Sequence, residues 1–251
     1  MKKTLILYAL FVNAFAYAQN PSEWRLSKET FKGAGWTGLW EYNYDNNLLK
    51  EVRFYQDKKL FSVYKNFKYD APGNITSYQE IFYDSKTLSE KHYFTYSDNK
   101  LIKKEIYRLK NEEERFVMSL TYQWTDKKVT LTRQEKNFAG LMESSIFYLL
   151  DDKKNITYIE GNDPNNINNT TLSKFTGYDK MPNPKIFTKF YHDDIDVISS
   201  NNPLQSFIGG TTDIYTMKYN SFGLTTSITA TTNYENSKAI NVSTYMYIKR
   251  F

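Results

Sequence analysis

The sequence predicts an all-β protein: an open, twisted antiparallel meander sheet built from consecutive β-hairpin repeats of about 26 residues. Two observations predict this class. A pair of large side chains at alternate positions recurs along the chain and is followed each time, within two residues, by Asp, Asn or Ser. The segments between these turns alternate with a period of two, and we find no long amphipathic helical pattern. An irregular insertion is expected near residues 180–210.

The recurring pairs mark one end of each hairpin. They are Tyr42/Tyr44, Phe67/Tyr69, Phe94/Tyr96, Tyr122/Trp124, Tyr148/Leu150 and Met217/Tyr219. The second residues of the first five pairs are separated by 25, 27, 28 and 26 positions, and a degenerate copy follows at Tyr178-Asp179. Each period holds two strands and two short turns. Because residues two apart share a face of a strand, the pairs are expected to form an aromatic ladder across the sheet.

The N-terminal residues are typical of an export signal. Lys2 and Lys3 precede an apolar run from Thr4 to Phe15, and Ala16-Tyr17-Ala18 offers the small-x-small cleavage pattern. We therefore predict a signal peptide over residues 1–18 and a single repeat-built domain over residues 19–251. The destination is the periplasm, the cell surface or the medium. The chain has no cysteine, so no lipoprotein anchor and no disulfide are expected. No later segment approaches the length of a transmembrane helix.

The regular pattern loosens and then returns. Pro182-Asn183-Pro184 and Asn201-Asn202-Pro203 interrupt strand pairing, because proline lacks the backbone donor. The intervening stretch predicts an irregular excursion or a short helix. Three further strands are expected over Thr211 to Tyr219, Thr225 to Thr232 and Ile240 to Lys249.

Charge and aromatic content bear on possible partners. The formal charge is +5, of which Lys2 and Lys3 leave with the signal, and the remaining basic residues are interleaved with Glu and Asp. A nucleic-acid surface would gather the positive charge in one patch, so no nucleic-acid partner is expected. Aromatic residues make up 17% of the chain. A glycan or a protein on the sheet surface is the predicted partner, and an open sheet would allow self-association through its edges.

Two turn units resemble a known repeat. Tyr69-Asp70-Ala71-Pro72-Gly73-Asn74-Ile75 and Tyr219-Asn220-Ser221-Phe222-Gly223-Leu224 are similar to the tyrosine-aspartate ("YD") repeat of bacterial extracellular shell proteins. The layout from Trp40 to Tyr247, with Tyr178-Asp179 before Pro182-Asn183-Pro184 and the later paired asparagines, resembles uncharacterised secreted YD-repeat-like sheets of Bacteroidetes. The resemblance implies an envelope or secreted protein with an open antiparallel sheet. It implies no catalytic residues.

Candidate binding residues fall in two groups. Tyr93, Tyr107 and Tyr122 would form an aromatic platform on the sheet. His192 and Asp194 lie in the irregular insertion, where Asp193, Asp194 and Asp196 are also a weak candidate for Ca²⁺ binding, although a solvated acidic turn is the simpler interpretation.

The chemistry available for catalysis is sparse. The only other histidine, His92, is expected to face solvent from its strand, and carboxylate pairs such as Glu51 with Glu80 carry no specificity. We therefore predict an exported, non-enzymatic binding or scaffold module without a cofactor. The alternative is a secreted, glycan-directed hydrolase whose site lies within residues 183–210.

Overall fold

The computed structural model describes residues 23–33, 35–83, 88–111, 113–138, 140–163, 166–188, 190, 198–199, 201–208, 210–233 and 238–250. The predicted signal peptide lies outside these residues. Within the described part of the chain, no helix has both the length and the apolar character needed to cross a membrane.

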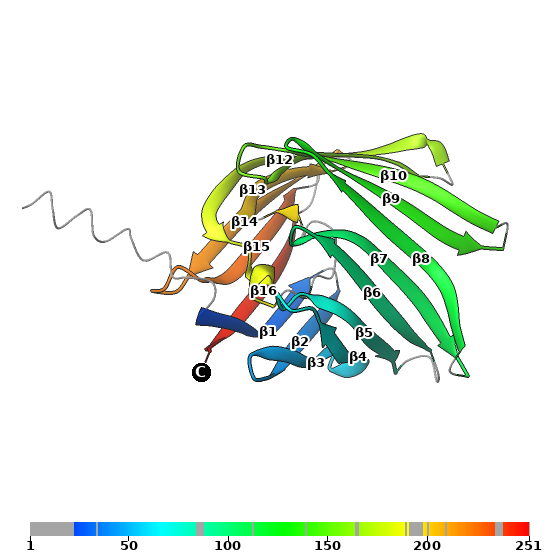
Figure 1. Ribbon diagram of the computed structural model, residues 1–251. Helices are drawn as coiled ribbons and strands as arrows, with labels where there is room; N and C mark the ends of the chain where they lie inside the picture. The colour runs from blue at the N-terminus through cyan, green and yellow to red at the C-terminus, as the bar shows by residue number, and fades with distance from the viewer. Residues whose placement is uncertain are drawn as a thin grey trace, which may run out of the picture.

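Sixteen antiparallel strands form one closed barrel, in which each strand pairs with its neighbours in the sequence (Figure 1). The strands are β1 (Trp24–Gly33), β2 (Trp36–Asp45), β3 (Leu48–Gln56), β4 (Lys59–Tyr69), β5 (Ile75–Phe82), β6 (Ser89–Ser97), β7 (Lys100–Lys110), β8 (Glu113–Trp124), β9 (Lys128–Asn137), β10 (Gly140–Leu150), β11 (Ile156–Asp163), β12 (Asn166–Pro182), β13 (Asn201–Ile208), β14 (Thr211–Tyr219), β15 (Thr225–Asn233) and β16 (Lys238–Lys249). One short 3-10 helix, η3 (Pro184–Phe187), lies between β12 and β13.

The predicted open sheet is wrong, because the first and last strands pair with each other. The register runs from Trp24 opposite Lys249 to Lys32 opposite Val242. This pairing supplies partners to the backbone groups that two free edges would leave open. The all-β class and the antiparallel hairpin meander are confirmed. The last three predicted strands correspond to β14, β15 and β16, whereas Asn201–Ile208, expected to be part of the insertion, forms strand β13.

The recurring aromatic residues lie at one end of the barrel, which we call the aromatic rim. Strands alternate in direction, so the turns that follow all even-numbered strands meet at this end. In five of these strands, an aromatic side chain near the end of the strand donates a hydrogen bond to a carbonyl near the start of the preceding strand. The pairs are Tyr44 to Leu26, Tyr69 to Leu49, Trp124 to Leu101, Tyr178 to Ile156 and Tyr247 to Thr225. These bonds give the sequence repeat a structural cause: five of the hairpins are each closed by their own aromatic donor.

The Asp after the aromatic residue shapes the turn itself. Asp70 Oδ1 accepts the backbone N–H of Asn74 at 2.7 Å, and Asp70 Oδ2 accepts the Asn74 side-chain amide at 3.0 Å. Asp151 and Asn155 repeat both contacts, at 2.8 and 3.3 Å. An Asp side chain that bonds to backbone a few residues later is a common way of fixing a turn. The Asp-x-x-x-Asn spacing therefore fixes two of the turns at the aromatic rim.

The Tyr178-Asp179 copy is a complete unit with an enlarged turn. Asp179 accepts the backbone N–H and the side-chain amide of Asn202, at 3.1 and 2.9 Å, as Asp70 does with Asn74. The two partners are 23 residues apart instead of four. The irregular segment between β12 and β13 is thus an insertion into one turn of the aromatic rim.

Candidate functional site

The enlarged turn runs into the barrel interior, and this shows which face of the sheet is inside. In the strand order, β12 and β5, and likewise β13 and β4, are seven positions apart around the ring. Phe190 nevertheless packs against Tyr64 of β4 and Tyr78 of β5, with ring centroids 5.0 and 5.4 Å apart. In Figure 1 the short yellow helix η3 lies within the ring of strands. We call residues 183–188 together with Phe190 the crossing segment, and its contacts define the inner face.

A buried ion pair fastens the crossing segment to strand β1. Lys185 Nζ contacts Glu29 Oε2 of β1, and the two side chains are only 10% and 9% exposed. The Tyr42 hydroxyl donates to the same Glu29 oxygen at 3.0 Å. Phe187, 3% exposed, stacks edge-on against Tyr247 of β16 at 5.3 Å. These contacts place the segment against β1, β2 and β16.

The inner face is mostly apolar. One core cluster surrounds Phe187 and Phe190 and includes Leu26, Tyr42 and Val52. A second cluster lines β7 to β12 and includes Ile198 from the enlarged turn. Its other buried members are Leu101, Leu120, Tyr122, Val129, Leu131, Tyr148, Leu150, Ile156 and Phe175. Apolar packing therefore lies inside the ring, on both sides of the barrel.

The outer face carries charged pairs at the middle of several strands. Neighbouring residues of a strand point to opposite faces, so Lys28 faces outward when Glu29 faces inward. Lys28 pairs with Glu41 of β2 at 3.3 Å. Three further outward pairs are Glu51–Arg53, Lys91–Glu114 and Lys103–Glu105, at 2.7, 2.7 and 2.9 Å. All eight side chains keep at least 27% of their surface exposed.

A pocket of about 540 Å³ opens at the aromatic rim, between the barrel wall and the crossing segment. We call it the rim pocket. Its apolar lining includes Tyr44, Tyr69 and Phe187, and two cationic side chains, Arg25 and Arg250, also line it. The Nε atom of Arg250 is buried and has no hydrogen-bond partner. The pocket thus combines aromatic walls with a guanidinium group that can donate a hydrogen bond to a ligand.

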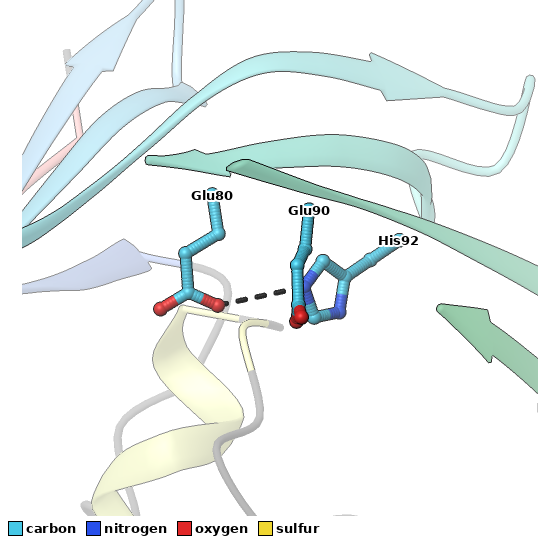
Figure 2. Close-up of side chains that lie close together, drawn as sticks. All are labelled: Glu80, Glu90 and His92. Carbon is cyan, nitrogen blue, oxygen red and sulfur yellow. Dashed lines mark ion pairs between the residues drawn. The ribbon is translucent and has the colours of Figure 1, made fainter. Parts of the chain in front are cut away.

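Three potential metal ligands meet on the inner face, on β5 and β6. The register pairs Tyr78 with His92 and Glu80 with Glu90. One ligand atom from each of Glu80, Glu90 and His92 lies within 4.8 Å of the other two. Figure 2 shows the three side chains converging, with Glu80 Oε2 at 3.4 Å from His92 Nε2. We call this group the inner cluster.

The surroundings of His92 correct the expectation that it faces solvent. His92 is 4% exposed, and its ring stacks on Tyr78 at a centroid distance of 4.5 Å. Burial lowers the pKa of His92, and the neighbouring positive charge of Lys104 adds to that effect, while Glu80 opposes it. Glu51 lies on the outer face and Glu80 on the inner face, so these two carboxylates do not form a pair.

The structure separates the residues predicted to bind a ligand. Tyr93 and Tyr107 lie together on the outer face, with rings 5.7 Å apart and edge-to-face, next to the Lys91–Glu114 pair. Tyr122 is 3% exposed and belongs to the inner core, so it cannot share their platform. His192, Asp193, Asp194 and Asp196 lie outside the described residues.

Sequence reasoning did not identify the inner cluster. The alternation Glu90-x-His92 places two of its members on one face and was a usable signal. The third member, Glu80, joins them only through the pairing of β5 with β6.

Comparisons with known proteins show similarity of fold only. No protein-family model and no curated protein sequence matches the chain. A crystal structure of a porin-like protein from Bacteroides vulgatus is similar, with a TM-score of 0.55, 11% identity, and coverage of 89% of this chain and 98% of that chain. A porin-like protein from Bacteroides uniformis aligns over the same shares with a TM-score of 0.45 and 13% identity. The first similarity supports a porin-like barrel fold.

Proposed function

We propose that this chain is an exported, non-enzymatic barrel of the cell envelope that works in an aqueous compartment and binds a small amphipathic anion at the rim pocket. One observation carries the proposal: the polarity of the barrel is the reverse of that of a membrane barrel. A membrane-spanning barrel has an apolar band outside and a polar interior. Here the packed apolar clusters lie inside, and the charged pairs lie outside.

The positions of the outer charges argue against a lipid contact along β1, β2, β3 and β7. Lys28, Glu41, Arg53 and Glu105 stand near the middle of these strands, at the depth where a bilayer is most apolar. An Arg or Lys on the lipid face costs about 2–4 kcal/mol at the bilayer midplane. In water, the same exposed pairs have almost no cost.

The chemistry of the rim pocket supports the ligand class. Its volume of about 540 Å³ falls within the range of about 300–1,000 Å³ that is usual for small-molecule sites. Tyr69 and Phe187 offer apolar surface to a hydrocarbon or ring, and Arg250 offers an N–H donor to an acidic head group. A fatty acid has both parts.

Fractionation tests the compartment. The full-length chain, expressed in a Gram-negative host, is expected in the soluble envelope fraction and should purify as a monodisperse species without detergent. Sedimentation with the outer membrane, resistance to carbonate washing and a need for detergent would overturn this part of the proposal.

Calorimetry tests the ligand class, with dodecanoate as the probe and dodecanol as its uncharged counterpart. We expect dodecanoate to bind better. Arg250→Gln should weaken dodecanoate binding about tenfold, the effect of losing one charge-assisted hydrogen bond of about 1.4 kcal/mol. Lys249→Gln removes a neighbouring exposed charge and should leave the affinity unchanged. Equal affinity for both ligands, or equal effects of both variants, would refute the role of the pocket.

One observation favours a second candidate, a barrel embedded in the outer membrane. The outer face of β13 to β16 exposes Phe207, Ile214, Ile240, Met246 and Ile248. Lys28 stands directly opposite Met246, so this apolar surface ends at a charged residue. The fractionation experiment separates the two candidates.

A further inference from the structure

The inner cluster contains a buried imidazole whose nitrogen atoms form no hydrogen bond within the protein. Both ring nitrogens of His92 are buried and have no hydrogen-bond partner. The 3.4 Å approach of Glu80 to Nε2 does not have hydrogen-bond geometry. Buried polar atoms nearly always have a partner, and each one without a partner costs about 1–3 kcal/mol. A histidine 4% exposed, aimed at two carboxylates, is therefore maintained at a cost that some ligand would offset.

The charges around the cluster leave room for a cation. Arg108 approaches Glu90 at 3.1 Å and neutralises that carboxylate in part. Glu80 is 8% exposed, and its Oε2 lies 3.4 Å from His92 Nε2. Two carboxylates and one imidazole then face a common point.

We propose that Glu80, Glu90 and His92 bind one divalent transition-metal ion, with Zn²⁺ as the best match. One nitrogen and two carboxylate oxygens form a donor set that Zn²⁺ accepts, at about 2.0–2.2 Å from each atom. The donors now lie within 4.8 Å of one another, so small side-chain rotations bring them to these distances. The Tyr78 ring stacked on His92 sets the plane of the imidazole, and three protein ligands leave one coordination position towards the barrel interior.

The site is independent of the rim pocket, so either proposal can fail alone. None of the three ligands lines the rim pocket. A structural zinc ion would normally have four protein ligands, whereas three are typical of an exchangeable or reactive site. We therefore expect exchange with Co²⁺ in solution.

Metal analysis of the full-length exported protein tests the proposal. The purified protein is stripped with chelator, incubated with ZnSO₄, passed through a desalting column and measured by mass spectrometry. We expect about one Zn²⁺ per chain for the wild type and loss of this ion in His92→Asn and Glu80→Gln. Glu114→Gln removes a carboxylate of the outer face and should keep the ion. Co²⁺ should give visible absorption bands that disappear in the same two variants.

A gain-of-affinity variant keeps the test decisive if the core variants fold poorly. Arg108→Gln removes the competitor for Glu90, and Arg108 is 49% exposed, so the fold should tolerate the change. We expect tighter Zn²⁺ binding and a larger rise in melting temperature on adding ZnSO₄ than in the wild type. No ion in the wild type, equal retention by His92→Asn, or unchanged affinity in Arg108→Gln would each overturn the proposal.

Discussion

The buried pair of Lys185 and Glu29 ties the crossing segment to strand β1, and removing one partner tests that arrangement. Lys185→Met keeps the length of the side chain but leaves the Glu29 carboxylate, 9% exposed, with the Tyr42 hydroxyl at 3.0 Å as its remaining donor. Breaking a buried ion pair on one side costs about 3–5 kcal/mol. Because Tyr42 still donates, we expect a loss of about 3 kcal/mol in the free energy of unfolding.

Urea unfolding measures this loss, with tryptophan fluorescence as the signal. Trp40 is a suitable reporter because its ring lies 5.7 Å from Lys185 Nζ. The double variant Lys185→Met/Glu29→Gln should regain most of the stability, since the glutamine is uncharged and its oxygen still accepts from Tyr42. Coupling between the two positions should therefore be strong.

Lys103→Met provides the matched control. Lys103 pairs with Glu105 at 2.9 Å on the outer face, where both side chains are substantially exposed. An exposed pair contributes at most about 1 kcal/mol. If Lys185→Met costs no more than Lys103→Met, or if the double variant is as unstable as the single one, the crossing segment does not lie in the barrel interior.

Three further predictions concern the rim and the enlarged turn. Tyr69→Phe removes the donor to the Leu49 carbonyl and should lower the free energy of unfolding in urea by about 0.5–1.5 kcal/mol. An unchanged midpoint would show that this hydrogen bond does not close the hairpin. Asn202→Ala breaks the contacts with Asp179 and should speed cleavage within residues 183–200 in limited proteolysis; wild-type cleavage rates would contradict this. Phe190→Ala should lower the free energy of unfolding by about 3–5 kcal/mol in thermal or urea unfolding, because the ring is 2% exposed among three aromatic neighbours. A loss below about 1 kcal/mol would show that the ring is not packed in the core.

Much of the fold could be predicted from local sequence patterns. The alternation of large and polar residues predicted the strands, and the recurring aromatic residue before Asp predicted the turns of the aromatic rim. Tyr44, Tyr69 and Tyr178 owe this regularity to one bond each, from a phenol to a nearby carbonyl. Burial raises the pKa of Tyr178 to about 12, so its phenol keeps the proton that it donates.

The candidate site was harder to predict, because the alternation of residues along a strand shows which residues share a face but does not show which face lies inside the barrel. Glu90 and His92 share a face by spacing alone, but the same pattern was compatible with solvent exposure. Glu80 joins them only through the β5–β6 register. Tyr122 was grouped with Tyr93 for the same reason, and the structure places these two on opposite faces.

The sequence by itself determined the local units of this protein: hairpins of neighbouring strands, each ended by an aromatic residue and an Asp or Asn turn. Such units depend on backbone conformation and on bonds between residues about 20 positions apart. Only the tertiary structure decided that the sheet closes, since the side chain of Ser27 meets the backbone of Met246 across 219 positions. Closure created an inside and an outside, and the enlarged turn after Asp179 then packed its aromatic residues within. The polarity of the barrel, its rim pocket and its inner cluster all follow from that closure.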